Sequence, residues 1–514
     1  MRNPRVVLAS LAGKSSSENY KYDRLYRNLY NPEFFCLAYQ HLYGKPVEMM
    51  EGVNNDTADG MSLEKINNLI ERLKDQSYQP APIGKADLPK RDGSNRPGIP
   101  SVEDQLVQEA VRMIQESIYE GKFEDTSHGF RPNKSCHTAI MQIQQRFSGV
   151  RWFVKGNIGN LFDNIDRHTL ISLLRKSIDD EKFINLIWKF LKAGYMKNWK
   201  WRKCHSGAPE GNIIGPILSN IYFHELDKYM KEYKVNFDKG KMREHSSEYV
   251  IARARIRHYQ DKISAAGKET EKGMEYLQKL KKLETKLNNT PSKNQMDKNF
   301  RRLFYTRHAG DFIVGIIGAK EDAEKINEDV TLFLKTKLNL QLPQENINII
   351  HSAEKTRFLS YDITTERGKN YRLQRSNGIK SAQDMPIRLY VPHEHWEGKL
   401  RELDVLDTTK EGQWKGKARP RMQQYDDLEI LLKYNSEIRR LYDYFRFAHN
   451  ANVLNKFCYI MEQSMLKTFA SKYRTSVSEI WGRYSKDGRF RVRYKTKKGE
   501  EFAYFIDKVK RQND

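Results

Sequence analysis

Strand-like and helical segments alternate through the middle of this 514-residue chain. Runs rich in β-branched and aromatic residues occur at 152–158 and 303–317, and a weaker run occurs at 347–350. Helical patterns lie between them, at 168–195 and 320–338. Strands separated by helices pack as a sheet with helices against it, so we expect an α/β or α+β domain of the kind found in enzymes.

The flanking segments have patterns of their own. Apolar residues at helical spacing predict helices at 62–76 and 103–118. The highly charged stretch 228–302 predicts a solvated helical hairpin, which can also lie along phosphates. Gly412 to Pro420 has the composition of a linker, and apolar and basic residues alternate from Phe490 to Tyr494. That alternation predicts a β-hairpin with one cationic face.

The net charge of the chain limits the kinds of partner that it can be expected to bind. Lys and Arg number 90 against 66 Asp and Glu, which gives a net charge of +24. A potential of this sign attracts polyanions, so nucleic acid and an anionic membrane surface are the candidates, with an ordinary basic soluble protein as the bland alternative. No segment approaches the roughly 18 consecutive apolar residues of a spanning helix, so we expect no membrane partner.

Cysteine usage and the N-terminus favour a cytoplasmic protein. The four cysteines (Cys36, Cys136, Cys204 and Cys458) lie far apart without a CxxC pair, so neither a zinc site nor a disulfide framework is expected. The apolar patch at 6–11 is too short for a signal peptide. We therefore expect a reduced, cytoplasmic protein.

Six short blocks follow one another in a fixed order. Their sequences are Arg96-Pro97-Gly98-Ile99-Pro100, Ser127-His128-Gly129-Phe130-Arg131-Pro132, Asn157-Ile158-Gly159-Asn160-Leu161-Phe162-Asp163, Gly207-Ala208-Pro209-Glu210-Gly211-Asn212, Arg307-His308-Ala309-Gly310-Asp311-Phe312 and Phe358-Leu359-Ser360-Tyr361-Asp362. Any one of them could arise by chance, but six in order could not.

In this order the blocks resemble those of group II intron reverse transcriptases. The likeness continues through Asp426-Asp427-Leu428, Tyr434-Asn435-Ser436 and Lys472-Tyr473-Arg474, which resemble the maturase region called domain X. It covers roughly residues 1–510. The resemblance implies an α+β protein with a right-hand fingers–palm reverse-transcriptase fold, a helical thumb and maturase domain X. No block resembles the family's endonuclease module, so we expect the chain not to cut target DNA by itself.

The resemblance also implies a domain order. The N-terminal extension and the start of the fingers would occupy 1–80, and fingers and palm 81–365, with the basic helical insertion at 228–302. A linker and the start of the thumb would follow at 366–425, and the thumb with domain X at 426–514.

The polymerase metal site departs from the family pattern. Nucleotide addition uses two Mg²⁺ ions about 3.5–4 Å apart, bridged by carboxylates. The family has aspartates in the third block and a Tyr-Ala-Asp-Asp turn in the fifth. Here the three matching positions are Asn157, Gly310 and Asp311, so a neutral amide and a bare backbone replace two carboxylates. We predict that these positions are inactive and that the protein itself binds no metal.

The surrounding nucleotide site is altered as well. The resemblance places four remnants there: Phe162 at the sugar-gating position, Arg96 in a turn shortened by one residue, Glu210 in place of a glutamine, and Asn346 in place of a basic residue. Gln105 stands for a usual Arg or Lys, and Asn212 for a glycine. So many changes around one site favour natural decay over deliberate inactivation.

Such a chain would keep the family's other task. A maturase binds its folded intron RNA and promotes splicing, and this needs basic surface but no catalytic carboxylate. We expect an intron ribonucleoprotein in which the protein requires no cofactor and the RNA binds Mg²⁺, and a DNA target would be reached through the RNA. The expected RNA-binding residues are Arg24, Arg27, Lys90, Arg91, Arg131, Arg439, Arg446, Lys467, Lys472 and Arg474.

Two rival functions stay open at this stage. One is a working RNA-directed DNA polymerase that serves intron mobility, and the other is a repurposed scaffold for another RNA or a protein. The oligomeric state is open too, with a dimer among the alternatives.

Overall fold

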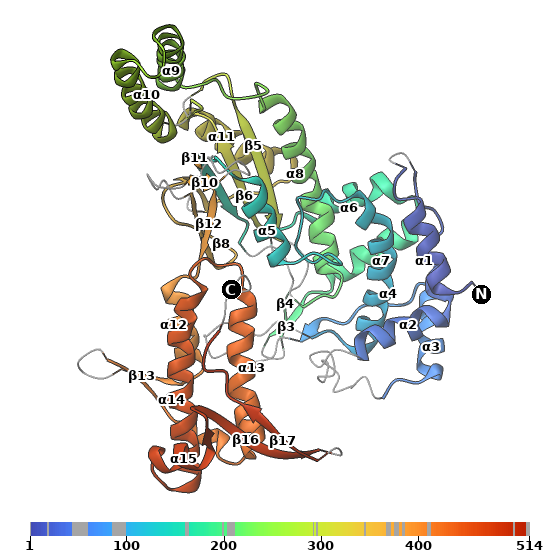
Figure 1. The fold of residues 1–514 in the computed structure, drawn as a ribbon. Helices are drawn as coiled ribbons and strands as arrows, with labels where there is room; N and C mark the ends of the chain where they lie inside the picture. Colours follow the sequence, from blue (N-terminus) through green and yellow to red (C-terminus); the bar gives the residue numbers. More distant parts are fainter. Residues whose placement is uncertain are drawn as a thin grey trace. The chain divides into compact units, whose positions relative to one another are not determined.

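The computed structural model describes most of the chain. The described residues are 2–17, 20–43, 60–84, 99–159, 164–197, 200–202, 211–290, 292–294, 297–343, 346–365, 372–374, 380–382, 386–408, 413–496 and 499–509. The chain forms two compact units, one of residues 1–351 and 367–385 and the other of 352–366 and 386–514 (Figure 1). The chain therefore crosses between the units three times.

A four-stranded antiparallel sheet in the order β5-β6-β2-β7 forms the centre of the first unit. Its strands are β2 (Trp152–Asn157), β5 (Arg302–His308), β6 (Asp311–Ile317) and β7 (Ile347–His351). Helices α5 (Cys136–Arg146) and α8 (Gly215–Phe237) contact β5, and α11 (Lys320–Lys337) contacts β2 and β7. These strands and α11 confirm the segments predicted from the alternating pattern.

The N-terminal part of this unit is helical. It contains α1 (Pro4–Gly13), η1 (Tyr26–Tyr30), α2 (Pro32–Tyr43), α3 (Leu63–Lys74), α4 (Val102–Tyr119), η3 (Glu120–Lys122), α6 (Arg167–Ser177) and α7 (Glu181–Lys192), with a small sheet of β1 (Ile83–Gly84), β3 (Tyr195–Lys197) and β4 (Lys200–Arg202). Helix α3 begins at Ser62, whose side chain accepts the Lys65 amide. Of the predicted apolar stripe it buries Ile66, Leu69, Ile70 and Leu73, whereas Leu63 in the first turn is exposed. Its apolar face joins the main core.

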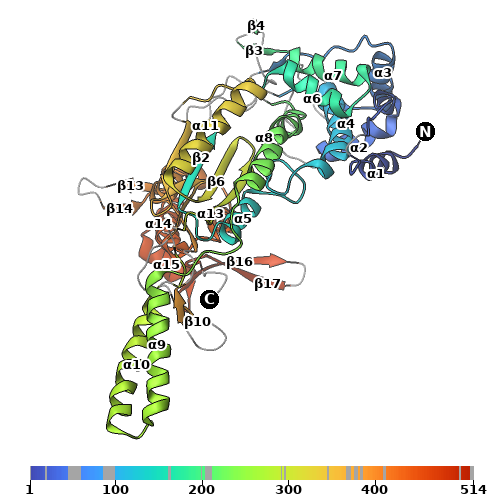
Figure 2. The same ribbon diagram turned by 90° about the horizontal axis from the view of Figure 1, so that it is seen from above.

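The predicted charged hairpin is present. Helices α9 (Ser247–Ala266) and α10 (Glu271–Asn289) pack against each other and project from the sheet as an arm (Figure 2). Gly267 ends α9 with a φ of +81°, a conformation that suits glycine. The rings of Tyr259 and Tyr276 lie 5.9 Å apart between the two helices. Few residues of the arm are buried, so most of its charges face solvent.

The second unit is built on helices α13 (Asp427–Phe445) and α14 (Leu454–Tyr473). Around them lie β8 (Thr356–Phe358), β9 (Tyr361–Thr365), β12 (Ile387–Tyr390), α12 (His393–Glu402), β13 (Leu406–Thr408), β14 (Trp414–Gly416), η5 (Pro420–Met422), η6 (Ala451–Val453), α15 (Val477–Tyr484), β15 (Ser485–Lys486), β16 (Arg489–Thr496) and β17 (Gly499–Tyr504). A short hairpin of β10 (Arg372–Gln374) and β11 (Lys380–Ala382) belongs to the first unit. The β16–β17 hairpin confirms the one predicted around Phe490.

The stretch expected to be a linker is partly structured. Trp414 stacks edge-on against Trp396 at 5.2 Å, and Arg419 makes a largely buried ion pair with Glu437. These long-range contacts hold segment 413–422 against the helices, whereas its Gly- and Pro-rich composition predicted a connector. The unit division also crosses the predicted boundary at residue 365, since β9 pairs with β12.

No helix among the described residues combines the length and the apolar character needed to cross a lipid bilayer.

A buried histidine on α8 predicts acid sensitivity of the first unit. Burial lowers the pKa of His224 from 6.5 to about 4, and Lys228 acts in the same direction. Between these pH values the unfolded chain binds a proton that the folded chain does not, so the free energy of unfolding falls as the pH drops. Among the described residues the Nδ1 atom of His224 has no hydrogen-bond partner, and its ring lies edge-on to Phe123.

We therefore expect His224→Phe to weaken the pH dependence. From pH 7 to pH 5 the wild type should lose about 2 kcal/mol more free energy of unfolding than the variant. Urea unfolding followed by tryptophan fluorescence measures this, with the exposed His258→Gln as control. Equal losses in wild type and His224→Phe would contradict the assignment.

Candidate functional site

The three positions that match the family's metal ligands meet at one end of the central sheet. Asn157 ends β2 and lies opposite Asp311, the first residue of β6. Ala309 and Gly310 form the turn between β5 and β6, and the Gly310 carbonyl accepts the Ile158 amide at 2.9 Å. The blocks far apart in sequence therefore build a single site.

Asn346 belongs to the same site. It directly precedes β7, whose first residue Ile347 lies opposite Gly156 on β2. A Cβ atom placed on Gly159 would lie 3.8 Å from Asn157 Oδ1 and 3.9 Å from Asn346 Nδ2. Two amide side chains thus approach the same point from neighbouring strands.

The charges at this site are unsuited to a pair of divalent cations. Lys155 and Asn157 share one face of β2, and Ile313 and Asp311 are their partners on the same face of β6. Burial raises the pKa of Asp311, and the positive charge of Lys155 partly opposes this. The described donors are one carboxylate and two neutral amides beside an ammonium group. Since paired Mg²⁺ ions need several anionic oxygens, this set does not fit them.

Among the described residues, no three or more His, Cys, Asp or Glu side chains lie together in a cluster that could hold a metal ion. Three predicted nucleotide-site remnants, Phe162, Arg96 and Glu210, lie outside the described residues, as do the predicted RNA contacts Lys90 and Arg91. Gln105 is buried and donates its side-chain amide to the Pro100 carbonyl at 2.9 Å.

Arg307 anchors the turn that carries Gly310. Its side chain is fully buried and donates to both carboxylate oxygens of Asp227 on α8, at 2.7 and 2.8 Å. The same guanidinium donates to Ser127 Oγ at 2.6 Å and to the Ala309 carbonyl at 2.9 Å. One side chain thus ties together β5, α8, the turn and the second sequence block. This role of Arg307 was not predicted from the sequence, although its alternation with Leu303 and Tyr305 along β5 was a usable signal.

The second block packs directly against the turn. A Cβ on Gly129 would lie 2.2 Å from the Ala309 amide nitrogen, so only glycine permits this approach. The Gly129 carbonyl accepts the Asn220 side-chain amide at 2.7 Å, and the His128 amide donates to the Arg307 carbonyl at 2.8 Å. The blocks therefore support the shape of the site independently of any metal.

Arg131 corrects one predicted RNA contact. The sequence predicts a surface cation, but the Arg131 side chain is buried and pairs with Glu120 at 2.8 Å. It also donates to the carbonyls of Glu124 and Ser127. Its hydrogen-bonding capacity is used to hold the second block, which leaves it unsuited to binding phosphate.

Comparisons with known proteins assign both parts of the chain. Residues 88–363 match the family model described as reverse transcriptase (RNA-dependent DNA polymerase), and residues 385–512 match the type II intron maturase model. A group II intron-encoded protein, LtrA, from Lactococcus lactis subsp. cremoris is 40% identical over 98% of this chain and 84% of its own length. The chain belongs to the group II intron reverse transcriptase and maturase family. The expected α+β reverse-transcriptase fold with a maturase region is thereby confirmed.

The chain is also similar to more distant relatives. An uncharacterized 91 kDa protein in the cob intron of Schizosaccharomyces pombe is 33% identical over 89% of this chain and 55% of its own length. Nuclear intron maturase 1, mitochondrial, of Arabidopsis thaliana is 23% identical over 76% of this chain and 58% of its own length.

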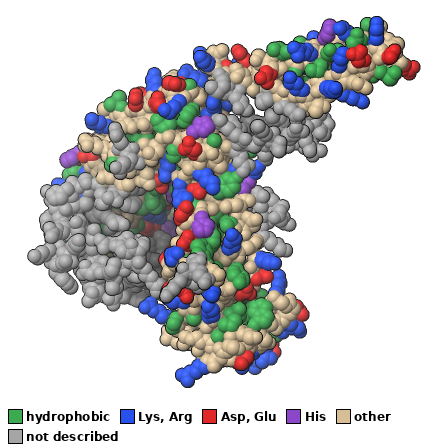
Figure 3. Space-filling view, turned by 90° about the vertical axis from the view of Figure 1, so that its left-hand side faces the viewer, with side chains coloured by type: hydrophobic (Ala, Val, Ile, Leu, Met, Phe, Trp, Pro, Cys, Tyr) green, Lys and Arg blue, Asp and Glu red, His purple; other side chains and the backbone are tan. Residues whose placement is uncertain are grey.

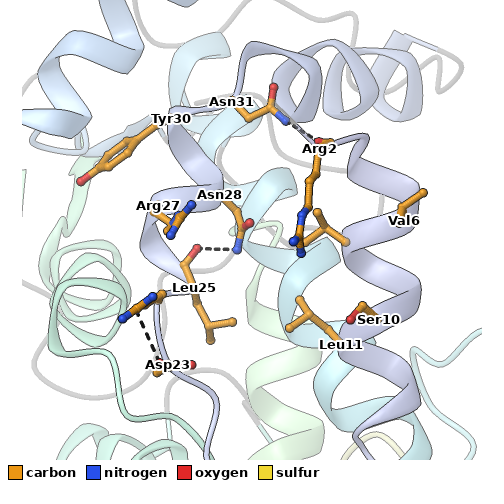
Figure 4. Close-up of a pocket in the computed structure, with 12 residues that line it drawn as sticks. Arg2, Val6, Ser10, Leu11, Asp23, Leu25, Arg27, Asn28, Tyr30 and Asn31 are labelled. Carbon is orange, nitrogen blue, oxygen red and sulfur yellow. Dashed lines mark hydrogen bonds and ion pairs between the residues drawn. The ribbon is translucent and has the colours of Figure 1, made fainter.

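Two predicted RNA contacts of this family member line a groove at the N-terminus. Arg24 and Arg27 are exposed, and with Arg2 they border a groove of about 910 Å³ between α1 and η1. Figure 4 shows Arg27 and Arg2 on either side of Asn28. Asp23 lies 3.7 Å from Arg24, with both side chains largely exposed. The three arginines outnumber this carboxylate, so the groove keeps a net positive charge.

The predicted contacts in the second unit differ in availability. Arg439, Lys467 and Arg474 are exposed, whereas Arg446 is half-buried beside the Phe447 ring. Lys472 pairs with Asp427 at 2.7 Å and is only 19% exposed, which leaves it less able to bind RNA. Lys467 donates to the Gly416 carbonyl at 2.7 Å.

The anchoring role of Arg307 predicts a large loss of stability on its removal. Arg307→Met leaves the Asp227 carboxylate buried without its cation, with only the Tyr305 hydroxyl still donating to it, which should cost on the order of 3–5 kcal/mol. The double variant Arg307→Met/Asp227→Leu should recover much of this loss, because no charge is left uncompensated. The exposed Lys320 of the Lys320–Glu324 pair provides a control, and Lys320→Met should cost less than about 1 kcal/mol. Thermal unfolding measures the stability of all three variants. An Arg307→Met protein as stable as Lys320→Met would refute the anchoring role.

Proposed function

We propose that this protein binds a structured group II intron RNA and promotes its folding and splicing, and that it has lost reverse-transcriptase activity. The observation that carries the second part is the donor set around Asp311. Asn157 and Gly310 replace carboxylates, and the ammonium group of Lys155 adds positive charge beside the one that remains. Two dications placed there would meet too few anionic oxygens and an unfavourable charge.

The fold does not depend on carboxylates at positions 157 and 310. The site is shaped by strand pairing between β2 and β6 and by the buried Arg307–Asp227 pair, neither of which involves Asn157 or Gly310 side chains. A chain of this kind can lose polymerase chemistry and keep its surfaces. The surfaces are what RNA binding requires.

Exposed cations on three surfaces support RNA binding. The first is the groove of Arg2, Arg24 and Arg27, and the second is the surface of the second unit, where Arg439, Lys467 and Arg474 are exposed. The third is the α9–α10 arm, where Figure 3 shows blue Lys and Arg side chains interspersed with fewer acidic ones. The arm carries Arg253, Arg255, Arg257, Lys262, Lys272, Lys279, Lys281, Lys282 and Lys286.

The proposal extends to the metal ion, the DNA target and the cellular compartment. Mg²⁺ would be bound by the phosphates of the RNA, which performs the splicing chemistry, and any DNA target would be recognised through the RNA. Cys36, Cys136 and Cys458 are free thiols, which suits a reducing cytoplasm.

Polymerase and splicing assays on the same preparation test the proposal. We expect no primer extension on an RNA template with Mg²⁺ or Mn²⁺, together with faster splicing of the intron RNA that co-purifies with the protein. Asp311→Asn should splice as the wild type does, since the carboxylate serves no metal. Robust extension that Asp311→Asn abolishes would show instead a working RNA-directed DNA polymerase.

The arm makes a separate prediction about salt. If Lys281 and Lys282 bind phosphates, log affinity for intron RNA should fall less steeply with log salt in Lys281→Gln/Lys282→Gln. The slope should change by about 0.7–0.9 for each phosphate that the variant no longer binds. Lys320→Gln/Lys325→Gln is the matched control, because these exposed lysines lie on α11 beside Glu321 and Asp322. Filter binding at several salt concentrations measures both, and equal slopes would exclude the arm from the interface.

A further inference from the structure

The β16–β17 hairpin has two chemically distinct faces. Phe490 and Val492 are buried on the inner face, which contacts α13 and α15. The side-chain amide of Asn435 donates to the Tyr504 carbonyl at 2.8 Å, and its oxygen accepts the Ile506 amide at 2.9 Å. The hairpin is therefore fixed on the helices, and its other face is directed to solvent.

The outer face combines cations with exposed aromatic rings. Directly paired residues share a face, and the pairs Arg491↔Tyr504 and Arg493↔Phe502 lie on this one. Phe502 is 40% exposed and Tyr504 46% exposed, which is unusual for rings on a packed hairpin. The cations of this face are Lys486, Arg489, Arg491, Arg493 and Lys495.

One of the two rings is held in place by a neighbouring cation. The Arg491 guanidinium lies 4.0 Å from the centre of the Phe502 ring. Glu500 is the one acidic side chain on this face among the described strand residues, and it pairs with Arg493 at 3.2 Å with both side chains largely exposed. Such an exposed pair is weak, so phosphate can displace it.

We propose that this face is a stacking platform for unpaired RNA bases. Phe502 and Tyr504 stand two residues apart on one strand, about 7 Å apart, so two successive bases can each stack on a ring. The surrounding cations would bind the phosphates that link those bases. Sheets with exposed aromatic side chains bind single-stranded RNA in this way, whereas bases inside a duplex are not available for stacking.

The inference rests on the proposed RNA binding but adds a distinct ligand. The arm and the N-terminal groove offer cations that bind phosphates. Single-stranded and double-stranded RNA both carry phosphates, so these surfaces do not distinguish them. The hairpin offers rings as well, so it should distinguish unpaired RNA from duplex. The inferred ligand of β16–β17 is therefore a single-stranded segment of the RNA.

Binding of a fluorescein-labelled oligouridylate and of a blunt RNA duplex to the full chain tests this. Phe502→Leu/Tyr504→Leu keeps apolar bulk without aromatic faces, and it should bind oligouridylate about 10-fold or more weakly. Phe502→Trp/Tyr504→Trp should bind as tightly as the wild type, and duplex affinity should stay unchanged in both variants. Glu501→Gln, exposed on the opposite face, is the matched control and should bind like the wild type.

Three results would overturn the platform. They are unchanged oligouridylate binding in the leucine variant, an equal loss of duplex binding, or failure of the tryptophan variant to restore affinity in a chain that melts like the wild type. Loss of self-association in the leucine variant, with RNA binding intact, would assign the face to a second copy of the chain instead. If the wild type binds oligouridylate but no intron RNA, the proposed function fails and the platform stands.

Discussion

The buried contact between Arg307 and Asp227 is the interaction on which the first unit most depends. Removing two charges from water is costly, and the cost is offset only because the guanidinium also reaches Ser127 and a backbone carbonyl. That geometry links a strand, a long helix and a loop that come from distant parts of the chain. It also holds the Ala309–Gly310 turn in shape without using the side chains of Asn157 and Asp311.

The backbone shape of the site at Gly310 does not depend on the side chains that would perform its chemistry. The turn at Gly310 is held by backbone pairing and by Arg307, so the side chains that face outward from it can change at little structural cost. Asn157 and Lys155 illustrate this, since both stand on a strand whose buried neighbours Phe153 and Val154 are ordinary core residues. The fold therefore tolerates residues other than carboxylates at positions 157 and 310. Decay of the cationic surfaces would not be tolerated by an RNA-binding function.

The sequence predicted those elements whose pattern is local. Periodicity alone located the stripe of α3, the strands of the central sheet and the charged arm, and the matched blocks located Asn157, Gly310 and Asp311. It could not show that Arg131 is buried, because its contacts with Glu120, Glu124 and Ser127 form only when the loop between α4 and α5 folds. Nor could it show that Lys155 lies beside Asp311, because these residues are far apart in the chain. The segment 413–422 was mistaken for a linker for the same reason. Tertiary contacts overrode a composition typical of loops.

The path of the chain between the two units limits how this protein can be divided. Strand β9 pairs with β8 and β12, yet the chain returns to the first unit before it reaches β12. A fragment that begins at residue 386 would keep β12 and lose its neighbour, leaving one edge of backbone amides and carbonyls unpaired. A separately expressed C-terminal half should therefore begin upstream of β8 and bridge residues 366–385 with a short artificial loop. The same path means that replacing 366–385 would remove β10 and β11 from the first unit, while β8, β9 and β12 of the second unit would keep their pairing.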